Sequence, residues 1–292
     1  MEVPEQEYVD ARGRSCYRMI ISQESSIYTS NPFTFNVQSR SFYVHSALIS
    51  KCSRPLDRMI SGHLKEANQG FANLNDVTEA TFTRFVRWLY VGDYPAASHK
   101  VKNEGGEASI KGETSDIDDW GSFTTPKKKK KKKEVSLRVA LKEKFIAWED
   151  DHVLPEVNAV SLASTRSNTA PDEDYTNVLL SHAQLYVFGE KYDIKALQQL
   201  SLRKLRHTLA TFTLYQERVD DILSLIRYTF AETGPTRHGE SSIRTMLMFY
   251  VSTEMEVLDS HGEIKGMLAE DPEMMNDFLA ILTMKINEKS IA

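Results

Sequence analysis

The ten residues from Ser41 to Ser50 constrain the fold most, because their hydrophobic pattern changes from a strand period to a helix period. Phe42 and Val44 alternate with their neighbours, which is typical of a strand with one buried face. Ser46 follows, and its hydroxyl is suited to accept a hydrogen bond from a free N–H at the start of a helix. We therefore expect a strand, a turn and a helix within this short stretch.

The flanking residues extend this pattern on both sides. Residues 33–37 alternate and predict the partner strand of a β-hairpin, and residues 71–74 predict a third short strand. A second short helix is expected to begin near Ser53. Asp76 stands three residues before a glutamate, so we expect it to cap a longer helix that ends at Gly92.

The order of these segments resembles the BTB/POZ domain, particularly as it occurs in fungal BTB proteins. The resemblance implies an α+β fold, in which a small sheet is flanked by helices, and a role in protein–protein association. Fold alone does not fix function. The matching residues are Phe42-Tyr43-Val44-His45, Leu48-Ile49, Leu56, Met59-Ile60, Gly62, Leu64-Lys65-Glu66 and the run from Phe85 to Tyr94.

Composition and the resemblance together divide the chain into five parts. The middle part is too polar in most windows to bury enough apolar surface to offset the entropy of ordering, so we expect it to be a disordered insertion. The C-terminal part shows apolar residues at helical spacing and is expected to be all-helical. The parts are a flexible N-terminus (1–19), the BTB/POZ core (20–95), a low-complexity, lysine-rich insertion (96–174), the closing helices of the fold (175–210) and a helical C-terminal region (211–292).

One segment of the insertion departs from its polar composition. Leu137, Leu141, Phe145 and Trp148 fall at helical spacing and predict a local amphipathic helix. Such a helix has two uses, and the sequence leaves both open. It either packs on the core of this chain or lies in a groove of a partner protein.

Residue types argue against an enzyme. The sequence has no glycine-rich phosphate loop, no nucleophile elbow, no His-Glu-x-x-His and no Cys-x-x-Cys. His45 and Cys52 are the one suggestive pair, and we interpret both as structural residues. The two cysteines form no disulfide framework, and the histidines show no metal-ligand spacing. We expect no cofactor, no metal and no small-molecule substrate.

Charge and hydropathy bear on the expected partners and compartment. The formal net charge of −5 argues against general affinity for nucleic acid. The N-terminus is acidic and poor in apolar residues, unlike a signal peptide, and no window resembles a membrane span. We expect protein partners, no membrane, and location in the nucleus or cytoplasm.

Leu64-Lys65-Glu66 resembles the hydrophobic-x-Glu signature of BTB adaptors in cullin-RING ubiquitin ligase complexes. An exposed apolar side chain would enter a groove of the cullin, and the carboxylate would meet a donor at its rim. Tyr90, Asp93 and Tyr94 are expected to add contacts from a neighbouring helix end. The alternative is that the triplet only begins a strand and that the helix end is only a stop.

The insertion also contains a run of lysines after Pro126. Such a run on a flexible tether resembles a nuclear import signal, although it is equally typical of a solvated charge run. The lysines are Lys127, Lys128, Lys129, Lys130, Lys131, Lys132 and Lys133. Two functions therefore compete. The first is a substrate adaptor of a cullin-RING ligase, and the second is a nuclear scaffold or transcription-associated regulator that acts through BTB self-association without a ligase.

Overall fold

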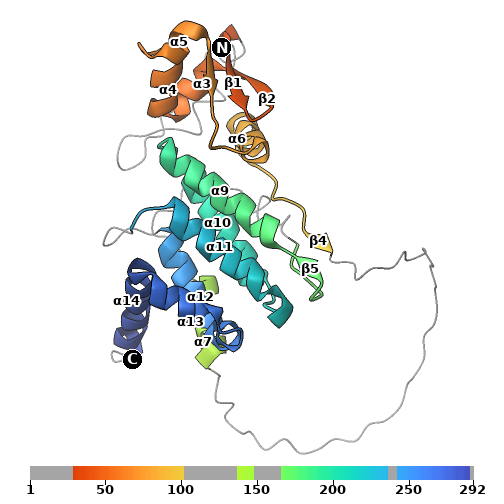
Figure 1. Cartoon of the computed structure of the whole chain (residues 1–292), viewed down its shortest axis with the longest axis vertical. Helices are drawn as coiled ribbons and strands as arrows, with labels where there is room; N and C mark the ends of the chain where they lie inside the picture. Colours follow the sequence, from red (N-terminus) through yellow and green to blue (C-terminus); the bar gives the residue numbers. More distant parts are fainter. Residues whose placement is uncertain (1–28, 102–136, 148–165, 236–241, 290–292) are drawn as a thin grey trace, which may run out of the picture.

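The structure is a computed structural model that describes residues 29–101, 137–147, 166–235 and 242–289. Figure 1 shows the N-terminal elements at one end of the molecule, helix α9 below them, and the C-terminal helices at the other end. The predictions for residues 1–19 and for most of the insertion lie outside the described residues. None of the described helices is long and apolar enough to cross a membrane.

A three-stranded sheet forms the N-terminal end, in the order β2-β1-β3. Strands β1 (Pro32–Val37) and β2 (Arg40–His45) form the predicted antiparallel hairpin, with Phe33 opposite Val44. The third predicted strand, β3 (Phe71–Asn73), pairs with β1 in parallel. The period-two pattern buries one face of the sheet, because every second residue of β1 points into the core.

Short helices pack against this sheet. They are α3 (Ser46–Cys52), α4 (Arg54–Ser61) and α5 (Lys65–Gln69). The expected cap at Ser46 is wrong, because α3 already includes Ser46 and its N-cap is His45, which makes no side-chain cap bond. The expected start of α4 is confirmed, since the Ser53 hydroxyl accepts from the Leu56 N–H at 3.1 Å.

Helix α6 (Glu79–Val91) completes the N-terminal elements. Its cap is Thr78, whose hydroxyl accepts from the Thr81 N–H, so the prediction of Asp76 as cap is wrong. Asp76 instead forms an ion pair with Lys191. Gly92 ends the helix as predicted, in the left-handed conformation with φ of 77°.

Helix α9 (Thr176–Lys191) lies between the two ends of the molecule (Figure 1). Leu185 and Phe188 belong to the core of the N-terminal elements, and Phe188 packs on Phe85 with ring centroids 4.6 Å apart. Leu179 and Ala183 lie on the other side of α9 and belong to the core of the C-terminal helices. The helix is therefore buried on two sides, one in each core.

The remaining helices confirm an all-helical C-terminal region. They are α10 (Lys195–Thr211), the short 3-10 helix η1 (Gln216–Arg218), α11 (Val219–Glu232), α12 (Ile243–Ser260), α13 (Glu263–Glu270) and α14 (Pro272–Lys289). The Asp271 carboxylate accepts from the Glu273 and Met274 N–H groups at 2.9 and 3.0 Å. The cap predicted for the last helix is therefore present.

Parts of the expected insertion are folded. Strand β4 (Lys100–Val101) pairs with β5 (Glu173–Asp174), so the described ends of the insertion meet. The predicted amphipathic helix is α7 (Leu137–Ala147), and Phe145 is buried against Tyr250 of α12, with ring centroids 5.6 Å apart. Of the two uses left open for this helix, the structure shows packing on the chain's own core.

The double-sided burial of α9 predicts a large effect of truncating one side chain. Leu185→Ala removes a fully buried side chain and is expected to lower the free energy of unfolding by about 2–5 kcal/mol, measured by urea denaturation. Leu279→Ala is the matched control, because Leu279 is also helical but half exposed, and it should change stability by about 0.5 kcal/mol or less. Equal effects of both substitutions would contradict this description.

Candidate partner-binding surface

The turn between α4 and α5 presents the predicted contact residue Leu64. Gly62 forms the turn, and a Cβ at this position would lie 2.2 Å from the carbonyl oxygen of Arg58. Only glycine therefore permits this close backbone approach. Leu64 follows as the N-cap of α5, makes no side-chain cap bond, and has a relative exposure of 49%.

The other two residues of the triplet lie in the first turn of α5. Lys65 is exposed and Glu66 is partly exposed, and α5 buries none of its residues. A carboxylate in a first turn is also favoured by the helix dipole, so Glu66 has a structural explanation as well. The alternative that the triplet begins a strand is wrong, because these residues begin a helix.

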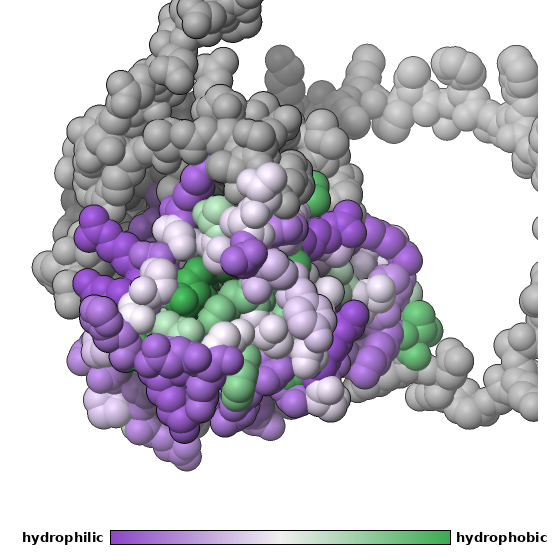
Figure 2. All heavy atoms as spheres, turned by 90° about the horizontal axis from the view of Figure 1, so that it is seen from above, coloured by the Kyte–Doolittle hydropathy of each residue, from purple (hydrophilic) through white to green (hydrophobic). Residues whose placement is uncertain are grey.

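The end of the molecule that carries α3, α4 and α5 has a mixed surface. Figure 2 looks onto this end and shows apolar side chains surrounded by hydrophilic ones. In the described N-terminal elements, the exposed large apolar side chains are Tyr43, Leu64, Tyr90 and Val91. An exposed apolar residue with a polar rim is the usual anatomy of a protein–protein contact.

Tyr90 is exposed in part, but its hydroxyl is engaged within the fold. The hydroxyl lies 2.7 Å from His45 Nδ1 and accepts from the His45 N–H at 3.2 Å. This contact joins the end of α6 to the junction of β2 and α3. Tyr90 thus has a structural role and offers only part of its ring to a partner.

Asp93 and Tyr94 belong to the fold rather than to a contact surface. Tyr94 is 1% exposed, so we leave it out of the candidate surface. The buried ammonium of Lys204 donates to the Tyr94 carbonyl oxygen at 2.6 Å and pairs with Asp93 at 2.5 Å. Asp93 therefore neutralises a buried cation, which is costly to leave unpaired.

Comparison with known families agrees with this architecture. Residues 32–103, which begin with β1 and extend past β4, match the family model of the BTB/POZ domain. The chain carries a BTB/POZ domain. No curated protein matches the chain. The BTB/POZ domain supports a role in protein–protein interaction and implies protein partners and self-association.

Two polar side chains that sequence reasoning missed tie the BTB/POZ domain to the helices after it. Lys204 of α10 contacts Asp93 and Tyr94, and His182 Nδ1 of α9 lies 3.0 Å from the Tyr94 hydroxyl. Burial, together with the nearby Lys204 ammonium, lowers the pKa of His182 to about 3. Burial also raises the pKa of Tyr94 well above its usual value.

The structure also describes Cys52 and one group of possible metal ligands. Cys52 Sγ lies 3.4 Å from the Ile49 carbonyl oxygen, as expected of a structural thiol. Among the described residues, one exposed group gathers possible metal ligands, Asp220, His261 and Glu263. Glu263 is already paired with Arg227. The run Lys127 to Lys133 lies outside the described residues.

Burial of neutral His182 predicts a pH-dependent stability. Unfolding takes up a proton at this site below pH 6.5, so the free energy of unfolding falls as the pH falls from 6.5 towards 3. The contribution approaches about 1.4 kcal/mol per pH unit. His182→Gln removes this contribution. We therefore expect the free energy of unfolding, measured by urea denaturation, to change less between pH 7 and pH 5 in the variant than in the wild type.

The wild-type protein is the reference for this slope, because all other titrating groups are common to both proteins. An absolute loss of stability in His182→Gln is compatible with the prediction, since only the slope is compared. Equal slopes in the two proteins would show that His182 is not held neutral by burial.

Proposed function

We propose that the protein is a substrate adaptor of a cullin-RING ubiquitin ligase, and that Leu64 and Glu66 of its BTB/POZ domain contact the cullin. The observation that carries the proposal is the exposure of Leu64, which is 49% although the residue is large and apolar. The surrounding helix α5 buries none of its residues, so the triplet is accessible to a partner.

The chemistry of the triplet suits a contact with one apolar anchor and a polar rim. A leucine side chain that enters a groove gains about 25 cal/mol for each Å² of apolar surface it removes from water. A carboxylate at the rim adds specificity and speeds association more than it adds affinity. Lys65 is exposed between them and extends the polar rim.

The C-terminal helices provide the remaining part of an adaptor. Helix α9 packs on the BTB/POZ domain through Leu185 and on the C-terminal helices through Leu179. A client bound to those helices would thus be held at a fixed place relative to Leu64. This proposal assigns the client to the helical region and the cullin to the BTB/POZ domain.

One observation favours the second candidate function, a nuclear scaffold that acts through self-association. Tyr43 is 70% exposed, and it lies in a row with Thr34 and Phe71 across the outer face of the sheet. An aromatic row of this kind is a suitable contact for a second copy. In this proposal the run Lys127 to Lys133 directs nuclear import, and substitution of Glu66 has no effect.

Titration calorimetry of the full-length protein against a cullin N-terminal domain tests the adaptor proposal. We expect micromolar or tighter binding, which corresponds to ~−8 kcal/mol or better. Leu64→Asp removes the anchor and Glu66→Lys reverses the charge at the rim, so each should weaken binding at least about tenfold. Circular dichroism checks that both variants fold.

Matched controls carry the same chemical changes elsewhere on the surface. Leu279→Asp alters an exposed leucine of α14, and Glu270→Lys reverses an exposed charge of α13. Both should bind the cullin domain as the wild type does. Absence of heat with the wild type at any accessible concentration would refute the adaptor proposal and favour the scaffold.

A further inference from the structure

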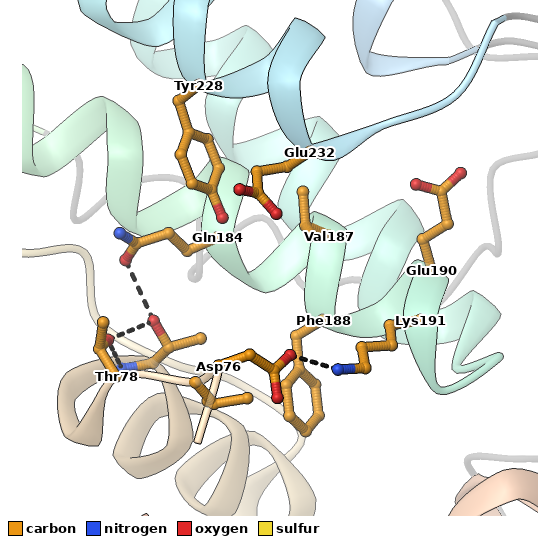
Figure 3. A pocket seen from close by; sticks show the side chains of 11 residues that line it. Asp76, Thr78, Gln184, Val187, Phe188, Glu190, Lys191, Tyr228 and Glu232 are labelled. Carbon is orange, nitrogen blue, oxygen red and sulfur yellow. Dashed lines mark hydrogen bonds and ion pairs between the residues drawn. The ribbon is translucent and has the colours of Figure 1, made fainter. Parts of the chain in front are cut away.

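A pocket lies where the BTB/POZ domain meets the helices that follow it. Its volume is about 420 Å³, which is in the usual range for ligand sites. Its walls come from the start of α6 and the segment before it, from α9 and from α11 (Figure 3). The lining includes three carboxylates and one ammonium, from Asp76, Glu190, Glu232 and Lys191, so its formal net charge is negative.

The single lysine of the lining is already neutralised. Lys191 forms an ion pair with Asp76, which crosses from α9 to the segment before α6 (Figure 3). The amide oxygen of Gln184 accepts from the Thr81 hydroxyl at 3.0 Å. These two contacts join the BTB/POZ domain to α9 across the pocket.

The third side of the pocket is formed by α11, which contributes a tyrosine hydroxyl and a carboxylate. Tyr228 and Glu232 lie one turn apart on α11, and both reach into the pocket (Figure 3). Tyr228 is half-buried and Glu232 is exposed, and within the described parts of the chain neither side chain has a hydrogen bond or an ion pair with another residue. A carboxylate beside an aromatic hydroxyl is a suitable partner for a cation.

The electrostatics of the lining agree with this geometry. Burial and the nearby Glu232 carboxylate raise the pKa of Tyr228 to about 12, so the hydroxyl remains protonated at neutral pH. Burial also raises the pKa of Glu190. Burial is the largest cause of both shifts, so the lining is partly shielded from water, and a carboxylate there attracts a cation more strongly than it does in bulk water.

We propose that this pocket binds an arginine side chain of a partner protein, with its guanidinium against Glu232 and Tyr228. The planar guanidinium has five donors and also stacks on aromatic rings, so it fits a carboxylate and a tyrosine better than an ammonium does. Its aliphatic stem would cover Val187, which lines the same pocket. A protein is the expected source because the BTB/POZ domain is a protein-interaction module.

This inference goes beyond the proposed cullin contact and does not depend on it. Leu64 and Glu66 belong to the start of α5, whereas none of the pocket residues comes from that element. The pocket would let the protein recognise a second partner, or a client, by a basic residue. If the cullin does not bind, the arginine proposal is unaffected. If the arginine probe does not bind, the cullin proposal is unaffected.

The test is a nuclear magnetic resonance titration of the full-length protein with N-acetyl-L-arginine amide. We expect saturable shifts of amides in α9 and α11. The citrulline analogue has the same shape without the charge, and it should not bind. Glu232→Gln should weaken binding of the arginine probe at least about tenfold, because a charge-assisted hydrogen bond contributes about 1.5–3 kcal/mol.

Two further variants of the protein make the test specific. Tyr228→Phe keeps the ring and removes the hydroxyl, so it should weaken binding less than Glu232→Gln does. Glu256→Gln is the matched control, because Glu256 is an exposed residue of α12 outside the pocket, and it should bind as the wild type does. The amide spectra of all variants report whether they are folded.

Three results would overturn the proposal. They are the absence of saturable shifts with the arginine probe, equal binding of the citrulline analogue, and unchanged binding in a folded Glu232→Gln. A fourth comparison addresses the source of the ligand. Tighter binding of free arginine than of the capped probe would contradict a protein source, whereas equal or weaker binding supports it.

Discussion

The burial of helix α9 on two sides is the constraint on which the rest of the structure depends. One side of the helix completes the core of the BTB/POZ domain through Leu185 and Phe188, and the other side begins the C-terminal core through Leu179 and Ala183. Helices of a small domain gain most of their stability from such packing rather than from intrinsic propensity. Helix α6, the last of the N-terminal elements, ends at Val91 and α9 begins at Thr176, so a long segment separates two parts of one core.

Polar side chains specify how these parts meet, and they also decide which residues are free for partners. Lys204 is buried and paired with Asp93, and His182 lies against the Tyr94 hydroxyl. Removing one member would leave a buried polar group without its partner, which costs more than the bond itself contributes. These contacts assign Asp93 and Tyr94 to the fold. Leu64, on a short helix without buried residues, remains the accessible part of the predicted surface.

Sequence periodicity predicted the hairpin and the C-terminal helices, because apolar spacing reports directly which face of an element is buried. The resemblance to the BTB/POZ domain rested instead on particular residues in a particular order. The sequence-based predictions failed where several neighbouring residues are suited to the same N-cap position. Ser46 and Asp76 are both good cap residues, yet His45 and Thr78 occupy the caps, since tertiary contacts set the helix starts. Lys204 was missed because a lysine within an amphipathic helix is normally solvated. The pocket at Glu232 was also missed, because its residues come from segments far apart in the chain.

The central claim is that α9 makes the BTB/POZ domain and the C-terminal helices one cooperative unit, so that partners on the two parts are held in a fixed arrangement. Native-state hydrogen exchange of the full-length protein, read by mass spectrometry on peptides from α6 and α12, tests this most directly. If the two parts unfold together, the slowest amides of both helices exchange with the same free energy of opening and the same dependence on urea. Opening of α6 at a clearly lower free energy than α12 would contradict it, and would show that the two parts unfold as separate units.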